Sequence, residues 1–176
     1  RGVNMLFKKK NKLTSVGITV GRNNGGQQDG YTRLRDNVLY MNADGKTKVF
    51  QLESSVASEG KTTVASNLAV SLGLINKKVV VVDLDFYRPR VHRMFYVEKE
   101  RGIADYILGN LKSTSIIKKT KYENVDVITG GSEVYNASLI FLSDKFKKLI
   151  DELKKKYDYV ILDCPPILQI SDYIHI

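Results

Sequence analysis

Short apolar segments alternate with amphipathic segments along this chain, and the alternation predicts its secondary structure. Apolar segments of strand length occupy residues 48–52, 78–83, 125–129 and 159–163. Apolar residues at helical spacing predict helices that begin near Tyr31 and Lys61 and that cover residues 102–108 and 143–156. Strands that alternate with helices are typical of an α/β fold, so we expect a mostly parallel sheet with flanking helices.

The first 30 residues follow a different pattern. They contain a basic run at Lys8–Lys10, a possible short strand over residues 15–20, and a polar, Gly-rich stretch over residues 21–30. Such a stretch is typical of a flexible linker. We therefore predict a basic segment with a linker over residues 1–28 and one folded domain over residues 29–176.

Composition narrows the classes of protein that fit. The chain of 176 residues suffices for one domain with a sizeable core. Its 28 Lys and Arg against 19 Asp and Glu give a net charge of +9, which suits an anionic partner such as a nucleotide, a membrane face or nucleic acid. The single cysteine, Cys164, excludes an internal disulfide. Because no apolar run has the length of a membrane span and no signal peptide is visible, we expect a cytoplasmic protein.

A phosphate-binding loop is the strongest chemical signal. Residues 55–63 lie between the predicted strand at 48–52 and the helix that begins near Lys61. Backbone N–H groups in such a loop converge on one concavity, and the helix N-terminus adds its positive dipole end. The residues expected to bind the nucleotide are Ser58, Glu59, Gly60, Lys61, Thr62 and Thr63. The usual first glycine of the motif is Ser55 here, and a plain capped helix is the alternative interpretation.

Three aspartates follow predicted strands. Asp83 and Asp85 end the strand at 78–83, and Asp163 ends the strand at 159–163. Carboxyl ends of parallel strands meet in the crevice where α/β sheets bind ligands. One carboxylate of the first pair can hold Mg²⁺ through water while the other accepts a proton from an attacking hydroxyl. An aspartate at a strand end can also be a simple turn residue, but three ordered sites predict a complex of magnesium with ATP.

Three motifs together resemble the bacterial tyrosine kinases, the cytoplasmic autokinases of capsule and exopolysaccharide synthesis. The motifs are Ser-Glu-Gly-Lys-Thr-Thr at 58–63, Asp83-Leu84-Asp85 with Arg88-Pro89, and Leu-Asp-Cys-Pro-Pro at 162–166. The resemblance covers about residues 29–170. It implies a P-loop NTPase fold of the deviant Walker A type that here lacks the family's C-terminal strands and tyrosine-rich tail.

The resemblance also implies roles for individual residues. Lys61 would act on the phosphates, with Asp83 as base or metal partner and Asp85 beside it as the third catalytic residue. Thr62, Asp83 and Asp163 would serve the magnesium ion, and Arg88 would bind the nucleotide. Family members transfer the γ-phosphoryl group of ATP to tyrosines of a neighbouring subunit.

Partners also follow from the resemblance. A membrane protein of the chain-length-regulator type would activate the kinase at the inner face of the cell membrane, where Lys8–Lys10 can add contact with lipid. The helix that carries Arg35 retains part of the family's self-association motif, and no nucleic acid is expected. Tyr87 stands where the family usually has arginine, although Arg88 can substitute for it.

Two other functions stay open. The first is a partitioning or cell-division ATPase, which passes the phosphoryl group to water. That class carries an additional lysine at the position occupied here by Val56, which counts against it. The second is a nucleotide-binding scaffold without catalysis. Tyr87 and the missing tail are the observations that suggest it.

Overall fold

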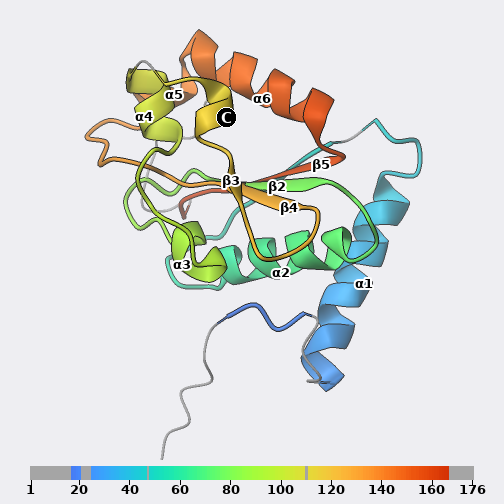
Figure 1. Cartoon of the computed structure of the whole chain (residues 1–176). Helices are drawn as coiled ribbons and strands as arrows, with labels where there is room; N and C mark the ends of the chain where they lie inside the picture. The colour runs from blue at the N-terminus through green and yellow to red at the C-terminus, as the bar shows by residue number, and fades with distance from the viewer. Residues whose placement is uncertain (1–16, 21–24, 47, 110, 167–176) are drawn as a thin grey trace, which may run out of the picture.

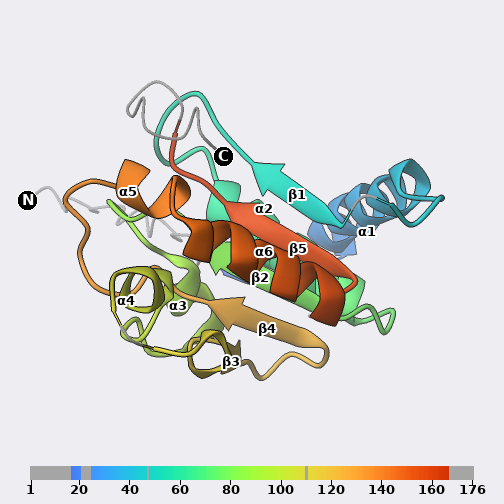
Figure 2. The same cartoon turned by 90° about the horizontal axis from the view of Figure 1, so that it is seen from above.

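A five-stranded sheet lies between two layers of helices (Figures 1 and 2). The protein is described by a computed structural model for residues 17–20, 25–46, 48–109 and 111–166. The strands are β1 (Val49–Leu52), β2 (Val79–Asp83), β3 (Lys118–Lys119), β4 (Val125–Ile128) and β5 (Tyr159–Asp163). Their order in the sheet is β1-β5-β2-β4-β3. Four strands are parallel, and only β3 among the described strands pairs antiparallel, so the predicted mostly parallel sheet is confirmed.

Helices cover both faces of this sheet. They are α1 (Gly25–Met41), α2 (Lys61–Gly73), α3 (Val91–Phe95), α4 (Ile103–Leu108), the 3-10 helix η1 (Ser113–Ser115), α5 (Ser138–Phe141) and α6 (Asp144–Lys156). Figure 1 shows α2 and α3 on one face and α4, α5 and α6 on the other. No helix in the described ranges is both long enough and apolar enough to cross a bilayer.

The central strands are buried on both faces, as their apolar sequence predicts. Along β2, Val80 and Val82 lie in the cluster that includes α6, whereas Val79 and Val81 lie in the cluster that includes α2. This alternation is the period of two that a strand imposes. Each fully buried valine contributes about 2 kcal/mol of transfer free energy. The two clusters therefore hold β2 and β5 rigidly, and with them the aspartates at their carboxyl ends.

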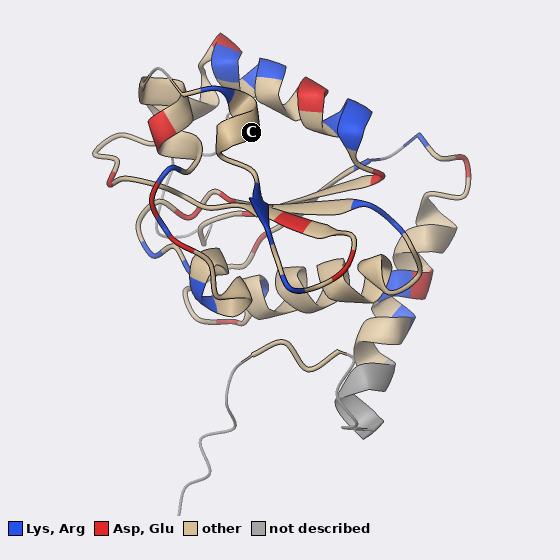
Figure 3. Cartoon of the chain, viewed as in Figure 1, with Lys and Arg blue, Asp and Glu red and all other residues tan. Residues whose placement is uncertain are grey.

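Helix α6 shows how local sequence sets an element's bounds. The hydroxyl of Ser143 accepts a hydrogen bond from the backbone N–H of Phe146, which caps the first turn. Basic residues gather in the last turn (Figure 3), where they interact favourably with the negative end of the helix dipole. The predicted helix over 143–156 is therefore confirmed.

Near the N-terminus, two predictions are wrong. Residues 17–20 do not form a strand, because their backbone bonds to a side chain of α2 instead: Oδ1 of Asn67 accepts from the N–H groups of Thr19 (2.8 Å) and Val20 (3.2 Å). The linker expected over 21–30 is helical from Gly25 onward, and α1 runs across the predicted domain boundary at residue 28. Packing of α1 against α2 outweighs the low helix propensity of its glycines. The basic run at Lys8–Lys10 lies outside the described residues.

Four short elements have no counterpart in the sequence prediction. They are α3, α5, β3 and the 3-10 helix η1, each of five residues or fewer. A periodic pattern needs a longer window than this to be visible. Of the four, α3 matters most for function, since it begins shortly after the Asp83-Leu84-Asp85 motif and packs against α2.

Candidate active site

The phosphate loop leads into the N-terminus of helix α2, and its backbone conformation suits the binding of an anion. Gly60 is the N-cap residue and has a φ of 93°, a left-handed conformation that favours glycine. Because glycine has no side chain, no side-chain cap occupies the first N–H groups of α2. Unoccupied N–H groups at a helix N-terminus, together with the helix dipole, favour a bound phosphate.

Two side chains of this first turn are already held in place. The Nζ of Lys61 donates a hydrogen bond to Oγ of Ser54, at 2.7 Å. The hydroxyl of Thr62 donates to Oδ2 of Asp163, at 2.6 Å. The second bond joins α2 to the carboxyl end of β5 and brings two predicted metal-site residues together.

Asp163 is a buried carboxylate with spare bonding capacity. It is 1% exposed, and its Oδ1 has no hydrogen-bond partner among the described residues. Burial raises its pKa to about 6, and the hydrogen bond from Thr62 opposes that rise. A divalent cation would satisfy the orphaned oxygen, and Mg²⁺ is usually held by one or two protein oxygens together with phosphates and water. The site fits magnesium in this form, although no cluster of three His, Cys, Asp or Glu residues with metal-binding geometry occurs in the described part of the chain.

The pH dependence of stability tests this burial. The folded-state pKa of Asp163 lies above its ordinary value, so the stability that its protonated form confers is lost as the pH rises through about 6. We expect Asp163→Asn, which stays neutral and can still accept from Thr62, to be more stable than wild type at pH 8, by up to about 3 kcal/mol. Urea unfolding from pH 4 to pH 8, without nucleotide or magnesium, measures the difference. A constant difference across this range would contradict the prediction.

Asp83 and Asp85 take different positions although they are two residues apart. Asp83 is fully buried, and its Oδ2 accepts from the backbone N–H groups of Arg90 (3.1 Å) and Val91 (3.0 Å). Its Oδ1 accepts from the N–H of Asp85, at 3.3 Å. Burial raises the pKa of Asp83, and the nearby charge of Asp163 raises it further. Backbone N–H groups thus occupy three of the roughly four acceptor sites of this carboxylate. Asp83 does not line the cavity, whereas Asp85 does.

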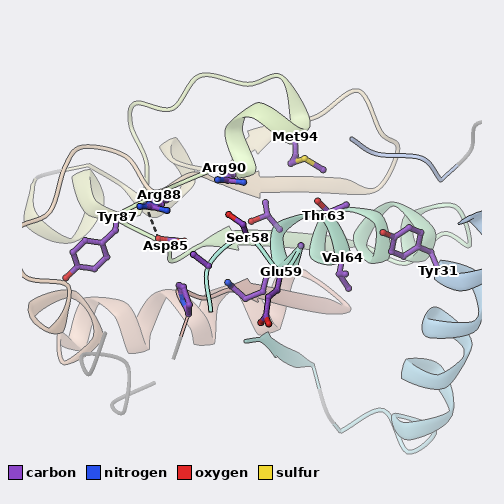
Figure 4. A pocket seen from close by; sticks show the side chains of 15 residues that line it. Tyr31, Ser58, Glu59, Thr63, Val64, Asp85, Tyr87, Arg88, Arg90 and Met94 are labelled. Atoms are coloured by element: carbon purple, nitrogen blue, oxygen red, sulfur yellow. Dashed lines mark hydrogen bonds between the residues drawn. The ribbon is translucent and has the colours of Figure 1, made fainter. Parts of the chain in front are cut away.

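These elements surround a cavity of about 580 Å³ (Figure 4). All the predicted nucleotide-binding residues line it, with Asp85, whereas Asp83 and Asp163 do not. Further lining residues that the sequence analysis did not assign to binding are Tyr31, Val64, Arg90, Met94 and Pro166, together with Ala57 of the loop and Tyr87, which was noted only as a departure from the family. Arg90 could have been suspected, since it directly follows the Arg88-Pro89 pair of the Asp83-Leu84-Asp85 motif. Tyr31 could not, because it comes from α1, far from the loop in sequence.

The sequence matches known families over most of its length. The profile of the family described as AAA domain matches residues 51–175. The chain is 30% identical over 139 residues to the putative tyrosine-protein kinase CapB of Staphylococcus aureus, which covers 79% of this chain and 61% of that protein. It is 32% identical over 142 residues to the tyrosine-protein kinase YwqD of Bacillus subtilis, which covers 81% of this chain and 60% of that protein. A putative tyrosine-protein kinase in the cps region of Klebsiella pneumoniae is 30% identical over 139 residues, covering 79% of this chain and 19% of that protein. The chain thus spans about three fifths of the first two relatives, and the predicted resemblance to bacterial tyrosine kinases is confirmed over that part.

Solved structures give the same picture of the fold. The chimerical protein CapA2B2 matches with a TM-score of 0.84 at 27% identity, over 92% of this chain and 71% of that one. The kinase domain of the Escherichia coli tyrosine kinase ETK matches with a TM-score of 0.84 at 26% identity. The match covers 99% of this chain and 65% of that one. The septum site-determining protein MinD of Pyrococcus horikoshii, complexed with Mg-ADP, matches with a TM-score of 0.60 at 30% identity. The match covers 72% of this chain and 52% of that one. The predicted P-loop NTPase fold is confirmed, and its shape is nearer to the kinase domain than to MinD.

Proposed function

The chain belongs to the AAA domain family, and we propose that it is an ATP-dependent protein-tyrosine autokinase that regulates capsule or exopolysaccharide biosynthesis and export. The observation that carries this proposal is the bond from Thr62 to Asp163 beside the uncapped start of α2. It puts a hydroxyl and a carboxylate with a free oxygen next to a phosphate-binding helix end. The likeness to CapB and YwqD supports tyrosine as the acceptor.

Each residue of the site has a role in this proposal. The backbone of residues 58–63 binds the phosphates, and Lys61 leaves Ser54 to contact the β- and γ-phosphates. Thr62 and Asp163 would hold a magnesium ion, which when bound would neutralise charge that develops on the phosphates. Asp85, which lines the cavity, accepts the proton of the acceptor tyrosine. Asp83 orients this carboxylate by bonding the backbone of its loop.

The partners and the location are proposed from the relatives. A kinase of the cps region among them supports a role in surface polysaccharide synthesis. We infer a cytoplasmic protein at the inner face of the membrane, where an activator of the chain-length-regulator type would meet it. Self-association would use α1, on which Arg35 now pairs with the neighbouring Asp36 at 2.7 Å.

A cell-division-type ATPase is the second candidate, because MinD with Mg-ADP shares the fold. It is weaker for two reasons. Its TM-score of 0.60 is lower than the 0.84 of the ETK kinase domain. The position of its additional lysine holds Val56, whose side chain is apolar and 45% exposed.

One experiment separates the candidates. The full-length protein is incubated with Mg-ATP and its membrane activator, and phosphotyrosine and free phosphate are both measured. We expect phosphotyrosine to accumulate, and omission of Mg²⁺ to abolish it. Release of phosphate without phosphotyrosine would favour the ATPase, and tight ATP binding with neither product would favour the scaffold.

A further inference from the structure

Arg90 lines the same cavity as the phosphate loop, although it belongs to neither the loop nor the Asp83–Asp85 pair. It lines this cavity and is exposed. Figure 4 shows Arg88, Arg90 and Met94 on one side of the cavity and Ser58 and Glu59 on the other. The guanidinium therefore faces the space in which the phosphates would lie.

The backbone of Arg90 is fixed by a buried group. Its N–H donates to Oδ2 of Asp83, as does the N–H of Val91, and Arg90 is the N-cap residue of α3. Asp83 is fully buried at the end of β2, the central strand of the sheet. The side chain of Arg90 thus extends from a backbone that is held in place. A side chain that binds a ligand in one orientation needs such support.

The charge of Arg90 is available to a ligand. Among the described residues no carboxylate forms an ion pair with its guanidinium. Lys61 also lines the cavity, so two cations reach it from different elements, Lys61 from α2 and Arg90 from the start of α3.

We propose that Arg90 contacts the terminal phosphate of ATP and so makes this site prefer ATP to ADP. The inference rests on the proposed function, in which the γ-phosphate must lie between the Thr62–Asp163 pair and the Asp85 carboxylate. Arg90 lines the same cavity as Thr62 and Asp85, and it lies on the same loop as Asp85. A planar guanidinium binds two phosphate oxygens at once and cannot be deprotonated, which suits a group whose charge grows during transfer.

Nucleotide affinities test this role without requiring phosphoryl transfer. The dissociation constants of Mg-ADP and of a non-hydrolysable imido analogue of Mg-ATP are measured by calorimetry for wild type, Arg90→Gln and Arg90→Lys. We expect Arg90→Gln to bind the ATP analogue about 10-fold more weakly and ADP within about twofold of wild type. Arg90→Lys should bind the ATP analogue more tightly than Arg90→Gln but more weakly than wild type. Lysine keeps the positive charge but lacks the planar guanidinium that binds two phosphate oxygens at once.

Arg93 provides a matched control. It is an exposed arginine of α3, the short helix that begins after Arg90, and does not line the cavity, so Arg93→Gln should bind both nucleotides as wild type does. Equal weakening of both nucleotides by Arg90→Gln, or no weakening, would overturn the inference. Failure of the proposed function looks different, because wild-type protein would then bind the ATP analogue but form no phosphotyrosine.

Discussion

Lys61→Met is expected to reduce phosphotyrosine formation roughly 100-fold or more. Removal of one preorganised charge that stabilises a transition state typically costs this much. Methionine keeps the apolar stem of lysine and leaves the backbone N–H groups of the loop in place, so nucleotide binding should fall less than the transfer rate. Phosphotyrosine is measured over time at saturating Mg-ATP, with the membrane activator present.

The fold should tolerate this change. The variant loses the hydrogen bond to Ser54, which is worth about 1 kcal/mol. Lys78→Met is the matched control, because Lys78 is an exposed lysine that precedes β2 at the opposite end of the sheet. If Lys61→Met retained most of the wild-type rate, the proposed assignment of the catalytic site would be wrong.

Gly102→Ala is expected to destabilise the protein by about 3 kcal/mol or more, the upper end for overpacking. A Cβ at this position would lie 2.2 Å from the carbonyl oxygen of Thr129 and 2.3 Å from the backbone nitrogen of Gly131. Both atoms are backbone, so no side-chain rotation can relieve the contact. The approach is close because α4 docks on the end of β4, where the N–H of Ile103 donates to the Thr129 carbonyl at 2.9 Å.

The same change should disturb the active site. The Cα of Gly130 approaches the Asp83-Leu84-Asp85 motif and its Arg88-Pro89 pair so closely that a Cβ there would lie 3.4 Å from Cβ of Pro89. Displacement of the segment after β4 would therefore press on the loop that carries Asp85 and Arg90. We expect weaker nucleotide binding in any folded fraction of Gly102→Ala.

Gly30→Ala is the control for this prediction. Gly30 is exposed within α1, and a Cβ there would meet no atom within 4 Å. Alanine in a helix is favoured over glycine, so this variant should be about 0.5 kcal/mol more stable than wild type. Urea unfolding compares both variants with wild type. Equal effects of the two substitutions would show that the close contact at Gly102 is not what restricts that position.

Long periodic segments were predictable, and short or non-local ones were not. The strand at 78–83 and the helix over 143–156 were identified because their apolar patterns extend over enough residues to have one interpretation. The segment at 17–20 has the apolar residues of a strand, but its N–H groups bond to Asn67, about fifty positions later in the chain. No local pattern contains that partner.

The sequence by itself determined which residue types meet at the site. A glycine before Lys61 and Thr62 and an aspartate at the end of each central strand predict phosphate and magnesium binding where the strands are parallel. These signals are local, since each depends on a strand, a turn and a helix that are contiguous in the chain. The order of the three motifs along the chain was also enough to indicate the kinase family.

Only the tertiary structure decided how these side chains are oriented and which groups they contact. It turned Asp83 toward the backbone of α3, left Asp85 at the cavity, and bonded Thr62 to Asp163 across 101 positions of sequence. It also brought Arg90 to the cavity beside the predicted phosphate loop. The physical reason is that orientation depends on which buried N–H groups need an acceptor, and that is settled by packing between elements distant in the chain.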